Sequence, residues 1–246
     1  MKPQEIYEIL EKEYFGENIH ESQEIATLQE LIKGIKVFVD VGASLGQYTY
    51  YANKTIKNGV IYAIEADPVR YKRLLELSKI WESESTNKIN VIHAAVSDRI
   101  GEIKFFTSNS NISGGLFTRE IAKAADVQWE EITVKSITLD SLLSDIIVDF
   151  IKIDVEGAEY RVIRGAEKIL RDSKPRIFME IHSWYDKDVK HFPQEVFNIF
   201  YGYKYSFSEI HHHFLFTKKQ KLGLKEHLMY MEKFLKQKIK KVLKYK

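Results

Sequence analysis

The chain of 246 residues contains no cysteine, which excludes disulfide bonds, thiolate zinc sites and a cysteine nucleophile. Apolar residues make up 44% of it and charged residues 29%, a globular composition with enough apolar material for a core. No apolar run approaches the length needed to cross a bilayer, and residues 1–13 lack the apolar centre of a secretory signal. We therefore expect a cytoplasmic protein.

The net charge of +2 conceals two parts of opposite sign. Residues 217–246 contain 11 Lys and 2 Glu, a net charge of +9, which leaves −7 for the rest of the chain. Nucleic-acid-binding domains need a basic face on the folded body. The acidic body therefore argues against nucleic acid as a partner.

The chain is expected to begin with a helical segment over residues 1–34, where apolar residues from Ile25 to Ile32 recur at helical spacing. Short, nearly continuous apolar segments rich in β-branched residues then predict buried parallel strands at residues 36–41, 59–65, 90–96, 148–154 and 176–181. Helical patterns lie between them at residues 47–57, 68–84 and 160–172. This alternation predicts a parallel α/β sheet.

Two further strands, at residues 203–209 and 213–218, flank a polar turn and predict an antiparallel hairpin at the sheet edge. The insert 101–138 should form two strands around a polar loop, near the carboxyl ends of the sheet strands, where open α/β sheets bind ligands. The predicted fold is Rossmann-like, with a seven-stranded, mostly parallel sheet and helices on both faces. We expect one domain over residues 35–220 and a basic amphipathic helix over residues 221–246.

A glycine-rich turn joins the first strand to the helix after it, and reads Asp40-Val41-Gly42-Ala43-Ser44-Leu45-Gly46. Its glycines permit a sharp turn and a close approach of a ligand to the main chain. A dinucleotide site needs G-x-G-x-x-G, and Ser44 breaks that pattern. An acid at the strand end repels a pyrophosphate but suits an ammonium group, such as that of S-adenosylmethionine.

A second acid, Glu65, ends the next strand, 25 residues after Asp40. A carboxylate there can accept hydrogen bonds from both hydroxyls of a ribose. Either acid alone reads equally well as a cap of the following helix. Small residues at the end of the third strand, Ala95 and Val96, leave room for an adenine ring. The combination favours a nucleoside site.

These motifs and a further block resemble the FkbM-type methyltransferase family. The matching stretches are Phe38-Val39-Asp40-Val41-Gly42-Ala43, Glu65-x-Asp67-Pro68, Ala95-Val96-Ser97-Asp98, Thr138-Leu139-Asp140 and, most selectively, Lys152-x-Asp154-x-Glu156-Gly157-Ala158-Glu159. The resemblance spans roughly residues 36–217. It implies the class I methyltransferase fold, S-adenosylmethionine as cofactor, and methyl transfer to oxygen, often on sugars or polyketide-like products. The chain departs from the family at Ser44, where Asn is usual, and at Ala66, where Pro is common.

We therefore expect an S-adenosylmethionine-dependent O-methyltransferase acting on a hydroxyl of a glycan, a glycolipid precursor or a small natural product. The expected cofactor contacts are Asp40, Gly42, Ser44, Gly46, Tyr48, Thr49, Glu65, Ala66, Ala95, Val96 and Asp154. Two rivals remain. One is a non-catalytic methyltransferase-fold subunit or binding module; the other is an NAD-dependent oxidoreductase, which the glycine spacing disfavours.

The expected catalytic residues, Lys152, Asp154, Glu180 and His182, lie at the carboxyl ends of the fourth and fifth strands. In one mechanism His182 or a carboxylate is the general base and Lys152 or Asp154 orients it. In the other, Asp154, Glu180 and His182 hold Mg²⁺ or Mn²⁺, which acidifies the acceptor hydroxyl. A purely structural interpretation competes with both mechanisms. In it Lys152 pairs with an acid, His182 is a buried histidine whose hydrogen bonds are satisfied, and Glu156 and Glu159 stabilise a helix N-terminus.

The lysine-rich end of the chain carries an apolar stripe at helical spacing, formed by Leu228, Met231, Leu235, Ile239 and Val242. Such a helix can lie on an anionic membrane surface, pack on its own domain, or join two subunits. A peripheral membrane contact or dimerisation through it is therefore an open expectation.

Three consecutive histidines, His211, His212 and His213, fall at the expected hairpin. Neighbouring residues of a strand point to opposite faces, so all three cannot readily bind one ion. We expect a solvated turn there.

Overall fold

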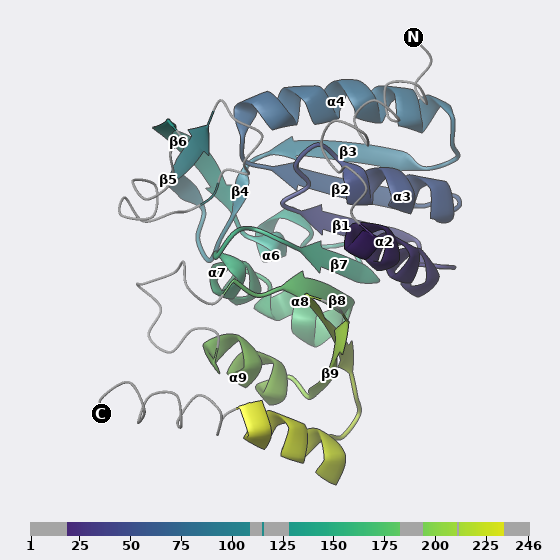
Figure 1. The fold of residues 1–246 in the computed structure, drawn as a ribbon, viewed down its shortest axis with the longest axis vertical. Coiled ribbons are helices and arrows are strands. Elements are labelled where there is room, and N and C mark those ends of the chain that lie inside the picture. Colours follow the sequence, from purple (N-terminus) through teal and green to yellow (C-terminus); the bar gives the residue numbers. More distant parts are fainter. Residues whose placement is uncertain (1–18, 109–114, 116–127, 183–193, 211, 234–246) are drawn as a thin grey trace.

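A computed structural model describes residues 19–108, 115, 128–182, 194–210 and 212–233. A seven-stranded sheet runs through the centre, with the order β3-β2-β1-β7-β8-β10-β9. Figure 1 shows this sheet between two layers of helices, with a smaller sheet of order β4-β6-β5 beside it. The predicted seven-stranded α/β fold is confirmed.

The strands of the large sheet are β1 (Val37–Val41), β2 (Val60–Glu65), β3 (Lys88–His93), β7 (Phe150–Ile153), β8 (Arg176–Glu180), β9 (Tyr205–Ile210) and β10 (His213–Lys218). The first five pair in parallel, and β10 runs antiparallel to both β8 and β9. The predicted hairpin is therefore the edge of the sheet. The carboxyl ends of β1, β2 and β7 lie side by side.

Each face of the sheet carries its own apolar core. On one face lie α2 (Ile19–Leu31), α3 (Gln47–Thr55) and α4 (Pro68–Ser83), whose Leu28, Ala52 and Leu74 are fully buried. The other face carries α7 (Glu159–Arg164), α8 (Glu167–Asp172) and α9 (Gln194–Gly202). Strands covered on both sides explain the continuous apolar runs in the sequence.

The predicted third strand is in fact two strands in different sheets. After β3 the chain leaves the large sheet, and β4 (Ala95–Val96) pairs instead with β6 (Trp129–Ile137). The insert supplies β6 and its antiparallel partner β5 (Gly101–Ser108), and so builds the small sheet. The end of the predicted strand is therefore drawn away from the large sheet.

The predicted helix over residues 160–172 is interrupted between α7 and α8 at Gly165. A Cβ on Gly165 would lie 2.1 Å from the carbonyl oxygen of Ser97, so only glycine allows the chain to pass so close. The short helix α6 (Leu139–Leu142) contacts this point, because Asp140 N donates to Gly165 O at 2.9 Å, and at the N-terminus of α6 Thr138 accepts a hydrogen bond from Ser141 N. This close approach fixes α7 against the strand ends.

The two ends of the chain are described only in part. Of the expected N-terminal helical segment the structure describes α2, and of the expected C-terminal helix it describes residues 224–233, the yellow helix in Figure 1. Tyr230 of that helix is buried and its hydroxyl donates to Tyr205 O at 2.6 Å. Residues 1–18 and 234–246 lie outside the described part. Within the described residues, no helix combines the length and apolarity needed to span a membrane.

Candidate active site

A pocket opens where the ends of β1, β2, β4 and β7 meet. It encloses about 640 Å³, including the part open to solvent. Its walls are formed by Val41, Gly42, Ser44, Ile64, Glu65, Ala66, Arg70, Ala94, Ala95, Val96, Phe105, Asp154, Val155, Glu156 and Ala158. Seven expected cofactor residues are among them: Gly42, Ser44, Glu65, Ala66, Ala95, Val96 and Asp154.

The glycine-rich turn forms one wall through its main chain. Gly42 has φ +74°, and a Cβ there would overlap the carbonyl oxygen of Asp154, so the turn lies directly on the end of β7. Ser44 has φ +50°, a left-handed conformation that Asn adopts more readily than Ser. This backbone explains the residue that the family usually has at this position.

Glu65 is held in place by main-chain donors. Its Oε2 accepts a hydrogen bond from Ser44 N and its Oε1 one from Asp67 N, both at 2.7 Å. Burial raises the pKa of Glu65 above its usual value, against the effect of these two hydrogen bonds. Each oxygen retains a lone pair, so the carboxylate can still accept from a ligand on the pocket wall.

Arg70 and Phe105 are two of the pocket residues to which the sequence prediction gave no role. Arg70 of α4 lies on the wall and forms an ion pair with Asp67, Nη1 to Oδ2, at 3.5 Å. Phe105 of β5 reaches the pocket from the small sheet. Nothing in the local sequence around Phe105 indicates this, because its position depends on the pairing of β4 with β6.

Asp40, an expected cofactor contact, is buried and is not among the residues that line the pocket. The residue is 0% exposed; Thr49 Oγ1 donates to its Oδ2 at 2.7 Å, and Lys152 Nζ lies 3.5 Å from its Oδ1. Thr49 is equally buried, and its hydroxyl is a hydrogen-bond donor to Asp40. Gly46, with φ +89°, faces Leu74 and Trp81 in the core. Asp40, Thr49 and Gly46 therefore stabilise the turn through contacts in the protein interior.

Lys152 is a buried cation that contacts both the glycine-rich turn and the residues at the end of β7. Its Nζ donates to Gly42 O at 3.1 Å and lies 3.7 Å from Asp154 Oδ2, and the ring of Tyr48 covers it at 4.7 Å. Burial alone would lower the pKa of Lys152, but Asp40 and Asp154 outweigh burial and raise it. Lys152 is therefore a positioning residue that stays charged. Tyr48, outside the pocket wall, lies with its hydroxyl 3.5 Å from Glu24 Oε2 of α2.

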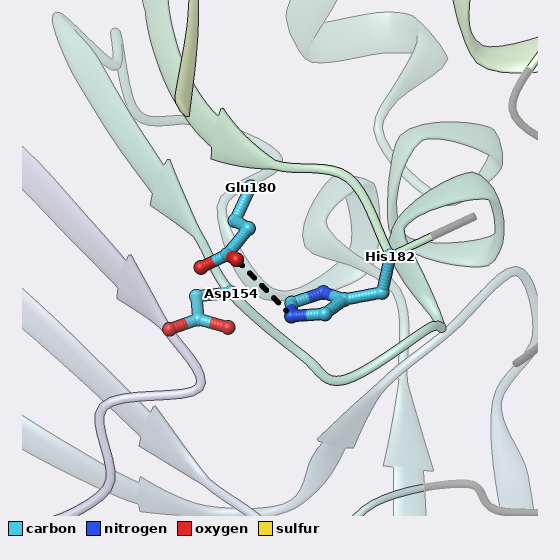
Figure 2. Close-up of side chains that lie close together, drawn as sticks. All are labelled: Asp154, Glu180 and His182. Atoms are coloured by element: carbon cyan, nitrogen blue, oxygen red, sulfur yellow. Dashed lines mark ion pairs between the residues drawn. The ribbon is translucent and has the colours of Figure 1, made fainter. Parts of the chain in front are cut away.

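Asp154 lines the pocket, and Figure 2 shows that its side chain lies close to those of Glu180 and His182. Asp154 follows β7, Glu180 ends β8, and His182 lies two residues further. Their nearest ligand atoms all lie within 4.8 Å of one another, and His182 Nε2 is 3.5 Å from Glu180 Oε1. The sequence prediction that these three side chains share a site agrees with this geometry.

Two glutamates complete this cluster. Glu159, fully buried at the start of α7, accepts a hydrogen bond from His182 Nδ1 at 2.8 Å, and Glu156 Oε2 lies 3.7 Å from His182 Nε2. Burial and the charge of Asp154 raise the pKa of Glu156 to about 7. For His182, burial lowers the pKa, but Glu159 and Glu156 outweigh burial and raise it to about 9. This raised pKa favours the protonated form of His182, which has no lone pair to act as a general base.

Glu156, for which the sequence left both a site role and a helix N-terminal role open, lies on the pocket wall. Its φ of +51° and the φ of +102° at Gly157 turn the chain after β7 so that the side chain reaches the pocket. A left-handed glutamate is rare and costs free energy, as is common at functional sites. The Glu-Gly pair in the block after β7 is the sequence signal for it.

The histidine turn departs from its prediction at one residue. His213 belongs to β10, is 3% exposed, and stacks on Phe178 at 4.3 Å between ring centroids. Its Nδ1 lies 3.5 Å from Glu24 Oε1. His212 is exposed as expected, and His211 lies outside the described residues.

The strand order, the hairpin edge and a pocket at the ends of β1, β2 and β4 define a class I methyltransferase fold. The model of the methyltransferase FkbM domain matches residues 40–207, more than half of the chain. The chain belongs to the FkbM methyltransferase family. Family and fold together support methyl transfer as its general chemistry.

Solved structures with similar folds include methyltransferases from several organisms. The FkbM methyltransferase from Methylobacillus flagellatus KT is 16% identical, with a TM-score of 0.51 over 74% of this chain and 43% of that one. This chain thus spans less than half of that protein. TrmK from M. capricolum, in complex with S-adenosyl-homocysteine, is 13% identical, with a TM-score of 0.41 over 80% of this chain and 68% of that one. Aeropyrum pernix fibrillarin, with natively bound S-adenosyl-L-methionine, is 15% identical, with a TM-score of 0.46 over 80% and 74%. A comparison with curated proteins found no match.

Proposed function

We propose that this protein is an S-adenosylmethionine-dependent O-methyltransferase that acts on a hydroxyl of a glycan, a glycolipid precursor or a small natural product. One observation carries the proposal. Glu65 and Ala95, which suit a nucleoside, line the same pocket as Asp154 and Glu156, which belong to the acidic cluster around His182. Cofactor and acceptor can therefore meet at Asp154.

The charge of the pocket favours a sulfonium nucleoside over a dinucleotide. Glu65, Asp154 and Glu156 line the pocket, and the cation on its wall, Arg70, is already paired with Asp67. A pyrophosphate would be repelled by these carboxylates, whereas a positively charged sulfonium is attracted by them. Glu65 is placed to accept from the ribose, and Ala95 and Val96 leave space for the adenine.

Glu156 is the general base that we assign. S-adenosylmethionine, when bound, supplies an electrophilic methyl group and leaves as S-adenosyl-homocysteine. A base with a pKa near the working pH combines an available lone pair with a useful affinity for the proton. Glu156, whose pKa is raised to about 7, takes the proton of the acceptor hydroxyl. This happens as the oxygen–methyl bond forms and the sulfur–methyl bond breaks. The products are a methyl ether and a protonated Glu156, and His182 beside it stabilises its ionised state.

A divalent cation is the second candidate for activating the hydroxyl. Asp154, Glu180 and His182 offer two carboxylates and one imidazole within 4.8 Å, a set that suits Mg²⁺ or Mn²⁺ better than Zn²⁺. Glu159 holds Nδ1 of His182, which leaves Nε2 toward the carboxylates, as in many metal-bound histidines. These three residues would hold the ion, and the ion would lower the pKa of the acceptor hydroxyl.

Calorimetry with the purified chain tests the cofactor. We expect saturable binding of S-adenosylmethionine and S-adenosyl-homocysteine and at least about tenfold weaker binding of NAD. Binding of NAD alone would favour the oxidoreductase. Methyl-labelled cofactor incubated with hydroxylated acceptors then tests turnover. Cofactor binding without transfer to any member of a broad glycan and glycolipid panel would favour the non-catalytic module.

Chelation separates the two mechanisms. With Glu156 as base, EDTA leaves methyl transfer unchanged and Glu156→Gln lowers kcat by about 10²–10⁴-fold. With a cation, EDTA abolishes transfer, Mn²⁺ restores it, and Mn²⁺ gives a bound electron paramagnetic resonance signal that Glu180→Gln weakens. Glu102→Gln, an exposed change on β5, is the matched control for both variants.

A further inference from the structure

The C-terminal helix, residues 224–233, presents an apolar face to solvent. Leu224, Leu228 and Met231 are 75%, 59% and 51% exposed, and their spacing of four and three residues places them on one side of a helix. Burial of an apolar side chain is favourable, so a row of three exposed ones requires a reason. The stripe noted in the sequence does not pack on its own domain in this part of the chain.

The opposite side of the helix is what attaches it to the protein. Tyr230 is buried and bonded to Tyr205 O, and Met229 packs against the core on the α9 face of the sheet. Tyr201 of α9 contacts His227 through a hydrogen bond of 2.9 Å between its hydroxyl and Nδ1. These contacts fix the rotation of the helix, so its apolar face is held outward rather than exposed by chance.

Exposed apolar residues are concentrated at this place. In the described residues, the exposed large apolar side chains number seven, and four of them, Tyr201, Leu224, Leu228 and Met231, belong to this helix or to the α9 residue in contact with it. The other three are separate from one another: Val69 lies in α4, Ile100 in the loop before β5, and Ile147 in the loop before β7. Scattered single residues are ordinary, whereas a gathered row indicates an interaction surface.

Positively charged residues lie around the N-terminus of the same helix. Lys219, Lys221 and Lys225 are exposed. Lys218 is close enough to Lys174 and Lys204 that, after burial, their charges contribute to lowering its pKa. In the sequence the stripe continues after residue 233 at Leu235, Ile239 and Val242, among six further lysines. An apolar row within a dense basic segment matches the chemistry of an anionic lipid surface, with acyl chains below and negative headgroups around.

We propose that this face, formed by Leu224, Leu228 and Met231 and flanked by Lys218, Lys219, Lys221 and Lys225, docks the protein on an anionic membrane surface. The three apolar side chains enter the boundary between headgroups and acyl chains, and the lysines contact the headgroups. The charges favour a membrane over a second copy of the chain, because the stripe in a second copy brings the same lysines and would place like charges face to face.

Vesicle co-sedimentation with the full-length chain tests this, and needs neither cofactor nor acceptor. We expect binding to vesicles of phosphatidylglycerol and phosphatidylcholine, at least about tenfold weaker binding to pure phosphatidylcholine, and loss of binding in about 0.5 M salt. Leu228→Glu should weaken binding to anionic vesicles by about tenfold or more. Ile147→Glu, at a residue 67% exposed outside the helix, adds the same charge and should leave binding unchanged.

The result is decided by the two variants together. Both positions are exposed, so circular dichroism melting curves should match that of the unchanged chain. Equal binding of Leu228→Glu and Ile147→Glu, or no preference for anionic vesicles, would overturn the proposal. A lipid-free dimer that Leu228→Glu disperses, without vesicle binding, would overturn it in favour of a second copy of the chain.

Discussion

Lys152 and Asp40 form an ion pair, 3.5 Å between Nζ and Oδ1, whose side chains are 2% and 0% exposed. The pair lies on adjacent strands, because Lys152 is opposite Asp40 in the register of β1 and β7. It therefore links the glycine-rich turn to the end of β7, after which Asp154 and Glu156 line the pocket. The two motifs that identify the family in the sequence are joined in space by this contact.

Removal of Lys152 should destabilise the protein strongly. Lys152→Met leaves Asp40 buried without its cation, and the loss of one partner of a buried pair costs about 3–5 kcal/mol of unfolding free energy. The double variant Asp40→Asn, Lys152→Met removes both charges and should regain most of that loss. Urea unfolding measures both. A single variant less than about 1 kcal/mol below the unchanged chain would contradict the role of Lys152.

Glycine at position 46 should matter for packing rather than for the cofactor. Gly46→Ala places a Cβ 2.5 Å from Leu74 Cδ1 and 2.9 Å from Trp81 at a φ of +89°, so strain and overpacking add. We expect a loss of about 2–5 kcal/mol in thermal or urea unfolding. Gly34→Ala is the matched control, because Gly34 has φ +78° but no atom within 4 Å of the new Cβ. Its loss should stay at about 1–2 kcal/mol, and equal losses would contradict the packing argument.

Much of the fold could be predicted because parallel strands and their turns leave local patterns. The apolar runs of β1, β2 and β7 and the glycine turn after β1 were all visible in the sequence. The departure of β4 was not, because Ala95 and Val96 are apolar in either sheet and their pairing with β6 is set by a distant segment. Periodicity cannot tell which sheet a buried strand joins.

The sequence predicted which side chains lie together in the candidate site. It predicted less well which of them are buried and paired with a charge. Asp154, Glu180 and His182 lie together because residues at neighbouring strand ends must do so. Asp40 is conspicuous in the motif, yet Lys152 occupies its carboxylate. The proposed roles of His182 and Glu156 depend on the buried Glu159, whose hydrogen bond raises the pKa of the imidazole. Such a charge network has no linear signature.

Glu65 should contribute to cofactor affinity through its charge. Glu65→Gln keeps the shape, but its amide NH₂ would face a main-chain donor at Ser44 or Asp67 and would offer one fewer acceptor to a ribose. We expect S-adenosylmethionine to bind about 10–100-fold more weakly by calorimetry, from the loss of a charged hydrogen bond. Glu102→Gln on the exposed face of β5 should bind normally. Unchanged affinity in Glu65→Gln would place the ribose elsewhere.

Glu156 should make stability depend on pH between about 4.5 and 7. Its pKa is raised from 4.5 to about 7 in the folded protein, so between these values the folded state keeps a proton that the unfolded state has released. Stability therefore falls as the pH rises through this window, and the deficit persists above it. Glu156→Gln has no such proton. Above pH 7 it should be more stable than the unchanged chain by up to about 3 kcal/mol, with no gain below pH 4.5.

Urea unfolding in EDTA at a series of pH values measures this difference, because EDTA removes any cation from the cluster. The gain should be less than the full amount, since the variant also loses the attraction between Glu156 and His182 at 3.7 Å. His182 keeps its hydrogen bond to Glu159, so the fold around it is retained. Parallel stability curves for Glu156→Gln and the unchanged chain across this range would show that Glu156 is ionised normally, and it would then be no better suited as a base than any exposed glutamate.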